Sequence, residues 1–125
     1  MALIYSDVVL RNPCQCEPAT KAVRALLDTG TNVLCIPPTL AEELQLEEVE
    51  KRHIKLADGA RCWVPYAGPV ELLFRGRHCF VGALVLGDEV RVGLAAIEDM
   101  RLVLDFRLHK VIVCDAPCLV VGVRG

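Results

Sequence analysis

The chain has 125 residues, of which 54% are hydrophobic and 24% are charged. This composition fits one compact domain over residues 1–125 and excludes a disordered chain. The formal net charge is −2 and the arginines are scattered, so no electrostatic feature favours a nucleic acid or an anionic membrane as partner. Apolar runs are far shorter than the roughly 20 residues that a membrane-spanning helix needs, and the N-terminus lacks the basic segment of a signal peptide. We therefore expect a cytoplasmic protein.

Most of the chain is predicted to form short strands, because β-branched and aliphatic segments alternate with turn residues. In chain order these strands are expected at residues 3–10, 22–27, 33–36, 54–56, 62–64, 70–74, 79–86, 102–106 and 111–114. Asp58-Gly59 and Arg75-Gly76 fall between neighbouring strands. They predict two hairpins, since glycine tolerates the positive φ of tight turns.

Two short helices are predicted between the strands. The first covers residues 39–46, where Thr39 and Glu42 have the spacing of a capping box. The second covers residues 95–100, a run of good helix formers that follows a glycine. The charged run 47–52 is predicted to be a solvated connection. The expected architecture is a mainly-β domain with two short helices.

Seven cysteines are many for a cytoplasmic protein, and their odd number argues against a fully paired secreted framework. Three lie among apolar neighbours and are predicted to be buried: Cys35, Cys62 and Cys79. The other four are predicted to be surface thiols or to form an adventitious disulfide: Cys14, Cys16, Cys114 and Cys118. Their spacing is not that of a zinc knuckle. We expect no metal and no cofactor, and a thiol-rich metal or redox protein ranks third among the functional readings.

The tripeptide Asp28-Thr29-Gly30 is the candidate for chemistry. An aspartate that leaves an apolar strand into a Thr-Gly turn lies where backbone amides can orient its carboxylate, and glycine permits a tight turn. Alone, the tripeptide is more typical of an Asx turn between two strands than of a catalytic site. Its context is more specific, because apolar strands are predicted on both sides, at 22–27 and 33–36.

Two downstream segments add to this context. One is the predicted hairpin at Asp58-Gly59, and the other is Val92-Gly93-Leu94, which precedes the second helix and a strand that ends in Asp105. In order and spacing the pieces resemble the retropepsin-like (clan AA) aspartic proteases, especially their small bacterial members. The resemblance covers the chain from residue 1 to about 113 and leaves the tail 114–125 outside the match. Its most specific parts are residues 26–30 and 92–94.

The resemblance implies a mainly-β, closed barrel-like acid-protease fold with one or two short helices and one lobe per chain. It implies a homodimer that cleaves a peptide or protein substrate, with Asp28 of each chain as the catalytic carboxylate. Thr29 and Gly30 would support the active-site loop, with the Thr29 hydroxyl bracing the two loops across the dimer axis. The hairpin tip would be the flap over the substrate: Leu56, Ala57, Asp58, Gly59 and Ala60. The Val92-Gly93 segment would pack beneath the catalytic loop.

The chemistry of paired carboxylates agrees with this assignment. Two carboxylates about 3 Å apart cannot both ionise, so the pair shares one proton. The ionised member can then activate water while the protonated member hydrogen-bonds to the developing oxyanion. One Asp28 cannot play both roles, so we expect a monomer to be inactive. The alternative function is a non-catalytic peptide-binding or dimerisation module with the same fold, against which the intact Asp28-Thr29-Gly30 argues.

Three residues depart from the family pattern. Arg91 precedes Val92 where an aliphatic residue is usual, so different local packing is expected there. Thr31 follows the tripeptide where alanine or serine is commoner. Asp58 puts a charge at the hairpin tip, where viral relatives are neutral and rich in glycine. Asp105 is predicted to anchor a turn rather than to act as a second catalytic acid.

Overall fold

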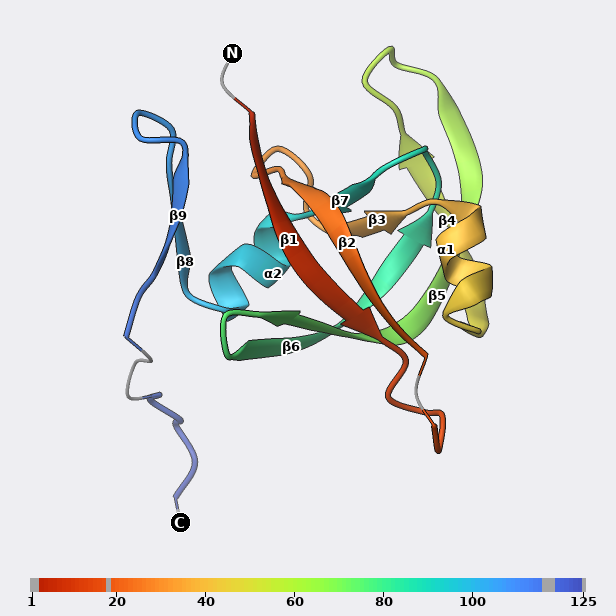
Figure 1. The fold of residues 1–125 in the computed structure, drawn as a ribbon. Coiled ribbons are helices and arrows are strands. Elements are labelled where there is room, and N and C mark those ends of the chain that lie inside the picture. The colour runs from red at the N-terminus through yellow and green to blue at the C-terminus, as the bar shows by residue number, and fades with distance from the viewer. Residues whose placement is uncertain (1–2, 18, 116–118, 125) are drawn as a thin grey trace.

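The computed structural model describes residues 3–17, 19–115 and 119–124. Figure 1 shows the elements, which follow one another in this order: β1 (Ile4–Arg11), β2 (Thr20–Leu27), β3 (Leu34–Ile36), α1 (Pro38–Glu43), β4 (Glu48–Lys55), β5 (Arg61–Phe74), β6 (Arg77–Val85), β7 (Val90–Val92), α2 (Leu94–Asp99), β8 (Leu102–Asp105) and β9 (Lys110–Val113). The predicted mainly-β architecture with two short helices is confirmed.

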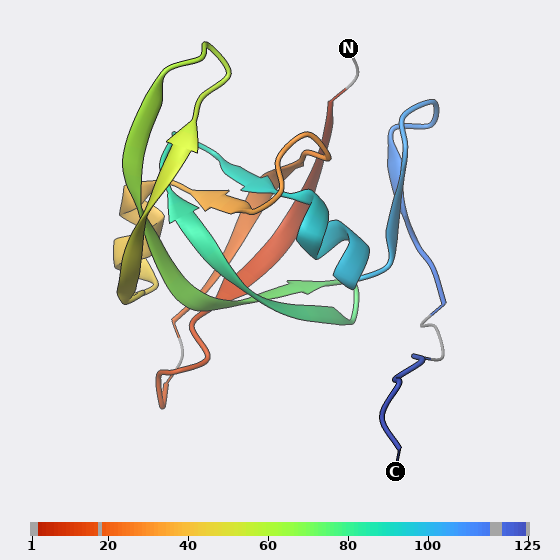
Figure 2. The same ribbon diagram turned by 180° about the vertical axis from the view of Figure 1, so that it is seen from behind.

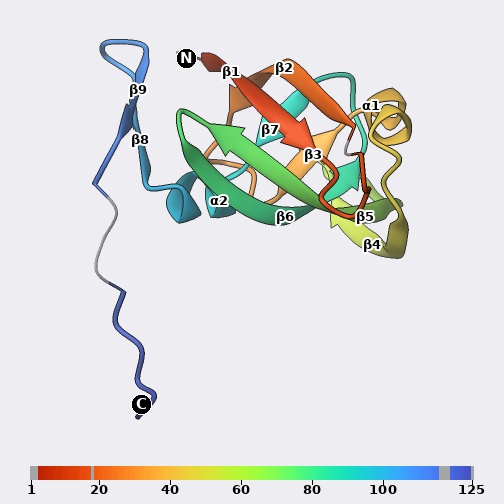
Figure 3. The same ribbon diagram turned by 60° about the horizontal axis from the view of Figure 1, so that its bottom comes forward.

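Six strands close into a barrel. They are hydrogen-bonded in the order β1-β2-β7-β3-β6-β5, and β1 also pairs with β5, which completes the ring (Figure 3). The closing register places Leu10 opposite Leu72 and Arg11 opposite Glu71. Both leucines are fully buried, as expected where alternate side chains of each strand point into a barrel.

The core fills this ring and extends under the helices. Its largest fully buried side chains come from strands and helix ends alike: Leu10, Leu34, Ile36, Leu44, Leu72, Met100, Val70 and Val92. Helices of six residues are too short to be stable alone. They are held by burial, about 1.5–3 kcal/mol for each large apolar side chain, with Leu40 and Ile97 as the buried contacts of α1 and α2.

Two local predictions are wrong. The charged run 47–52 forms most of β4 instead of a solvated connection, and its side chains are exposed because β4 pairs only with β5, outside the closed ring. The capping box at Thr39 is not made: α1 begins one residue earlier, at Pro38, and has no side-chain cap. Proline at the first helical position already sets the required φ and needs no amide partner.

Strand β5 joins two segments that the sequence analysis separates, 62–64 and 70–74. Its first half pairs with β4 to make a hairpin that projects beyond the barrel (Figure 2). Its second half pairs with β6 and closes the barrel against β1. The register shifts between Ala67 and Val70, so an irregularity in the strand pairing marks the boundary between hairpin and barrel.

Strands β8 and β9 form a separate two-stranded sheet beside α2 (Figures 1 and 2). Two arginines at the β5–β6 connection attach it to the barrel: Arg75 in the turn donates to the Val111 carbonyl at 2.9 Å, and Arg77 at the start of β6 donates to the carbonyls of Met100 and Cys114. The prediction for Asp105 is confirmed, since its Oδ1 accepts from the amides of the following turn at 3.0 and 3.1 Å.

The thiols differ in burial. Cys35 and Cys79 are buried as predicted, whereas Cys62 is only half-buried. Cys14 and Cys16 are exposed, and Cys118 lies outside the described residues. All cysteines in the described part of the chain are free, and no group of three or more potential ligands there could hold a metal ion. The described residues also include no helix with the length and apolar character to span a membrane.

One carboxylate is buried where the barrel closes. Glu71 is 6% exposed; its Oε1 accepts from Arg11 Nε at 2.7 Å, and its Oε2 lies 2.9 Å from His78 Nδ1. The hydrogen bonds from His78 and Arg11 outweigh the opposing effect of burial and lower the pKa of Glu71. Both carboxylate oxygens are therefore satisfied across the β1–β5–β6 junction.

We expect Glu71→Gln to lower the free energy of unfolding at neutral pH by about 1–3 kcal/mol, because charge-assisted hydrogen bonds are lost. The folded pKa lies below the unfolded one, so this contribution is complete above the ordinary glutamate range of about 4.3 and is lost as pH falls through the folded pKa. Urea unfolding at a series of pH values measures it. Glu43→Gln, which removes an exposed ion pair with Lys21, is the control. A difference from wild type that stays constant with pH would contradict the assignment.

Candidate active site

Asp28 directly follows the last residue of β2. The three residues before it, Ala25 to Leu27, are buried, and β2 pairs in parallel with β7 so that Leu27 lies opposite Val92. The Asp28 amide continues this ladder by donating to the Val92 carbonyl at 2.9 Å. The barrel thus holds the backbone of Asp28, while its side chain leaves the end of the strand.

The turn after Asp28 holds the carboxylate by hydrogen bonds. Its Oδ1 accepts from the Gly30 amide, and its Oδ2 accepts from the Thr31 hydroxyl, both at 2.9 Å. The Thr31 amide also donates to the Asp28 carbonyl at 3.2 Å. A Cβ on Gly30 would lie 3.2 Å from Oδ1, so glycine keeps this side of the carboxylate uncrowded. The turn after Asp28 therefore has the Asx-type hydrogen bond from Gly30, and this same bond fixes the carboxylate.

Gly93 lies against the backbone of this loop. A Cβ at Gly93 would come within 2.6 Å of the Thr31 carbonyl oxygen and 2.7 Å of the Val33 carbonyl oxygen. Next to Gly93, the Leu94 amide donates to the Thr31 carbonyl at 2.7 Å. The Ala95 amide donates to the carbonyl of the residue after Thr31 at 3.1 Å. The start of α2 and the loop after Asp28 are thus joined main chain to main chain.

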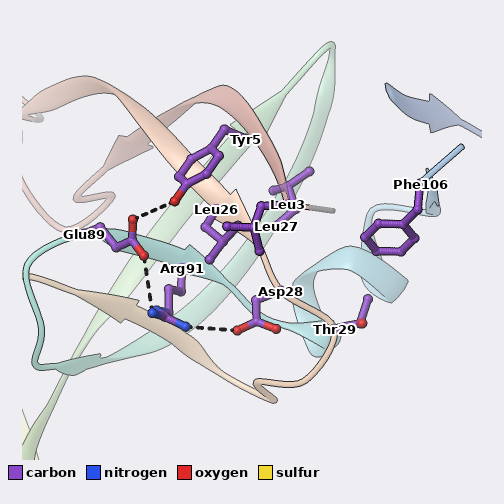
Figure 4. A pocket seen from close by; sticks show the side chains of 9 residues that line it. All are labelled: Leu3, Tyr5, Leu26, Leu27, Asp28, Thr29, Glu89, Arg91 and Phe106. Carbon is purple, nitrogen blue, oxygen red and sulfur yellow. Dashed lines mark hydrogen bonds and ion pairs between the residues drawn. The ribbon is translucent and has the colours of Figure 1, made fainter. Parts of the chain in front are cut away.

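Arg91 reaches the Asp28 carboxylate from β7. Its neighbours on the strand are buried, so alternation places its side chain on the other face. Arg91 Nη1 lies 3.3 Å from Asp28 Oδ2, and Arg91 Nη2 lies 3.3 Å from Glu89 Oε1. The Tyr5 hydroxyl donates to Glu89 Oε2 at 3.2 Å. Figure 4 shows these four side chains as one chain of polar contacts that ends at Asp28.

The contacts set the ionisation of Asp28, whose side chain is 27% exposed. Partial burial alone would raise its pKa. The hydrogen bonds from Gly30 and Thr31, together with the Arg91 guanidinium, outweigh that effect and hold the pKa of Asp28 below its ordinary value. Within one chain the group is therefore an ionised acceptor of protons.

Two hollows adjoin the loop that follows Asp28. The first, of about 550 Å³, is drawn in Figure 4 and is lined by Leu3, Tyr5, Leu26, Leu27, Asp28, Thr29, Glu89, Arg91 and Phe106. The second, of about 490 Å³, runs between the loop at residues 30–33 and the tip end of the β4–β5 hairpin, at residues 54–57. Arg91 and Glu89 line both hollows. A ligand entering between hairpin and loop would therefore pass Arg91.

The structure brings the predicted site residues to two places. Asp28, Thr29 and Gly30 form one loop with the Val92-Gly93 segment beneath it, and Thr29 is exposed at the edge of the first hollow. Their proposed roles stay predictions. Sequence reasoning gave no role to Tyr5 or Glu89. For Arg91 it expected altered packing and missed the ion pair.

The hairpin tip lies across the second hollow. Leu56 and Ala57 line it, whereas Asp58, Gly59 and Ala60 do not. The tip is closed by the Leu56 amide, which donates to the Ala60 carbonyl at 2.7 Å, and by Asp58 Oδ1, which accepts from the Ala60 amide at 2.9 Å. Gly59 has a φ of 90°, which explains glycine at this position.

Comparison with known proteins identifies the fold. No protein-family model and no curated protein matches the sequence. Among solved structures, the EIAV protease complexed with the inhibitor HBY-793 matches with a TM-score of 0.60 and 19% identity, over 78% of this chain and 86% of that one. The retroviral protease-like domain of Ddi1 from Leishmania major matches with a TM-score of 0.62 and 11% identity, over 93% and 91%. The predicted retropepsin-like fold is confirmed. The narrower resemblance to small bacterial members stays a prediction.

We expect Gly93→Ala to lower the free energy of unfolding by about 1–3 kcal/mol, because the added methyl group forces two backbones apart. Chemical denaturation measures the loss, and amide NMR shifts of residues 30–33 report the displaced loop. Gly122→Ala is the matched control, since a Cβ there meets open space. Equal stability of both variants would show that the close approach is absent in solution.

We expect Thr31→Val to raise the pKa of Asp28, because the variant keeps the shape of the side chain and removes the hydroxyl that donates to Oδ2. Titration of the ¹³C-labelled aspartate carboxyl by NMR follows this directly. Thr39→Val, on the exposed first turn of α1, serves as the control. An unchanged titration in Thr31→Val would show that the hydroxyl does not bind the carboxylate.

Proposed function

We propose that this protein is an aspartic endopeptidase whose active form is a homodimer, with Asp28 of each chain as the catalytic pair. The observation that carries the proposal is the Asp28 loop. A half-buried carboxylate at the end of a barrel strand is fixed by an amide and a hydroxyl and lines the first hollow, within a retropepsin-like fold. The fold alone hosts more than one function, so the proposal rests on this carboxylate.

A single chain lacks half of the required chemistry. Peptide hydrolysis by a carboxylate pair needs one ionised member and one protonated member. In one chain Asp28 is ionised and has Arg91 beside it, while Glu89 lies on the far side of that guanidinium. A second Asp28 brought to within about 3 Å would force the two groups to share a proton.

The shared proton permits a balanced reaction. The ionised carboxylate takes a proton from water as the water oxygen attacks the peptide carbonyl carbon, and the protonated carboxyl gives its proton to the carbonyl oxygen. The C–N bond then breaks as the nitrogen receives the first proton and the second returns to its carboxylate. The pair ends as it began, with one proton between two oxygens.

The surroundings of Asp28 could bind a peptide on one side and a second copy of the chain on the other. The second hollow lies beneath a hairpin whose backbone can pair with an extended peptide, and closure of the hairpin would exclude water. Around the first hollow, Leu3 and Phe106 are 52% and 46% exposed. Exposed apolar side chains beside Thr29 favour a contact with another chain, because such a contact would remove them from solvent.

We expect purified protein to cleave unfolded casein and Asp28→Asn to cleave it at least about 10³-fold more slowly. Asparagine keeps an acceptor oxygen for the Gly30 amide but cannot ionise. Inhibition by pepstatin gives an independent check. Asp7→Asn, an exposed change on β1, is the control. Cleavage that survives Asp28→Asn would refute the assignment, and peptide binding without cleavage would favour the non-catalytic module.

Dimer dependence is tested separately by sedimentation equilibrium beside an activity titration. We expect specific activity to rise with the dimer fraction as the concentration increases. Full activity in a strictly monomeric sample would exclude a catalytic pair formed by two chains.

A further inference from the structure

Arg91 places a positive charge beside Asp28. The proposed chemistry needs a proton shared between two carboxylates, and a nearby cation disfavours that sharing. The side chain of Arg91 is 46% exposed, the residue lines both hollows, and its guanidinium contacts an oxygen of the proposed catalytic carboxylate. Val90 and Val92 on either side are buried. The strand therefore fixes the direction of Arg91, and removing its side chain would leave the core intact.

The charged and titratable groups around this position come from several elements. Those that line a hollow beside Asp28 are Tyr5, Cys35, Lys55, Asp88, Glu89 and Arg91. Arg91 is the cation among them that contacts the carboxylate itself, at 3.3 Å. Its other terminal nitrogen is engaged by Glu89 at the same distance. Asp28 and Glu89 thus divide one positive charge between them.

This arrangement opposes the sharing of a proton. Two Asp28 carboxylates side by side hold one proton because their negative charges repel. A guanidinium beside each carboxylate compensates that repulsion and lets both ionise together. A fully ionised pair has no proton to give to the carbonyl oxygen, so it cannot catalyse. The pair regains its proton only as pH falls.

We infer that Arg91 confines cleavage to acidic conditions by pairing with Asp28, and that Glu89, oriented by Tyr5, weakens this pairing by competing for the guanidinium. The inference rests on the proposed function. Arg91 acts through Asp28 and is a positioning residue. A role in binding an acidic substrate side chain fits less well, because two resident carboxylates already occupy both terminal nitrogens.

The geometry gives the direction in which each substitution shifts the pH at which the carboxylate pair loses its proton. Arg91→Leu removes the compensating charge, so the pair keeps its proton to higher pH. Glu89→Gln removes the competitor, so Arg91 binds Asp28 more firmly and the proton is lost at lower pH. Tyr5→Phe removes the hydroxyl that orients Glu89, so Glu89 competes less well for Arg91 and the proton is lost at slightly lower pH. Arg91→Lys keeps the charge and stays near wild type.

The test is the pH profile of kcat/KM for these variants on one peptide. We expect the limb at higher pH to move up for Arg91→Leu and down for Glu89→Gln. The ratio of neutral to acidic activity should rise several-fold in Arg91→Leu. Lys21→Met, a loss of one positive charge about seven residues along β2 from Asp28, or roughly 23 Å, should leave the profile unchanged. Shifts of the same sign in Arg91→Leu and Glu89→Gln, or no shift, would overturn the inference.

A second measurement separates this inference from the proposed function. The ¹³C titration of the Asp28 carboxyl needs no catalysis, and we expect Arg91→Leu to raise its pKa and Glu89→Gln to lower it. Correct signs without proteolysis would support the ion pair and refute the protease. If the protein cleaves peptides but the pKa of Asp28 is unchanged in Arg91→Leu, the proposed function stands and the role of Arg91 is refuted.

Discussion

The contact between the backbone of Gly93 and the backbone of the Asp28 loop is the constraint on which the site depends. No side chain separates the two segments, because a Cβ at Gly93 would overlap the carbonyl oxygens of Thr31 and Val33. Amides of Asp28 and Leu94 add hydrogen bonds on either side. The backbone position of the Asp28 loop is thus set by main-chain atoms, which lose no rotamer freedom when the site is assembled.

The sequence was sufficient for the parts of the molecule that follow strong local rules. The strand end before Asp28 and the glycine before the second helix are both visible in the sequence, and the resemblance to retropepsin-like proteases implied that these two segments would meet. Only the end of strand β4 was predicted, within residues 54–56, and its residues 48–53 were missed for the opposite reason. It lies outside the closed ring, its residues 48–53 are all exposed, and a strand without a buried face shows no alternation of apolar residues.

The polar contacts at the site could not be predicted, because they depend on strand register. Arg91 reaches Asp28 since β2 and β7 pair with Leu26 opposite Arg91, and Asp28 follows Leu26 by two residues on the same face. A slip of one residue would send Arg91 to the other face. Glu71 is a parallel case, because only the closure of β1 on β5 brings Arg11 to it. Local sequence carries no signal for either pairing.

The cysteines differ in burial, so the rate at which each thiol is alkylated would report on a different motion of the protein. Cys14 and Cys16 are exposed and would be alkylated at once. Cys35 lines the hollow beneath the hairpin and burial raises its pKa, so its modification would await hairpin opening. Burial raises the pKa of Cys79 to about 12 in the barrel core, so its labelling marks global unfolding. One alkylating reagent would thus resolve surface, hairpin and core on separate timescales.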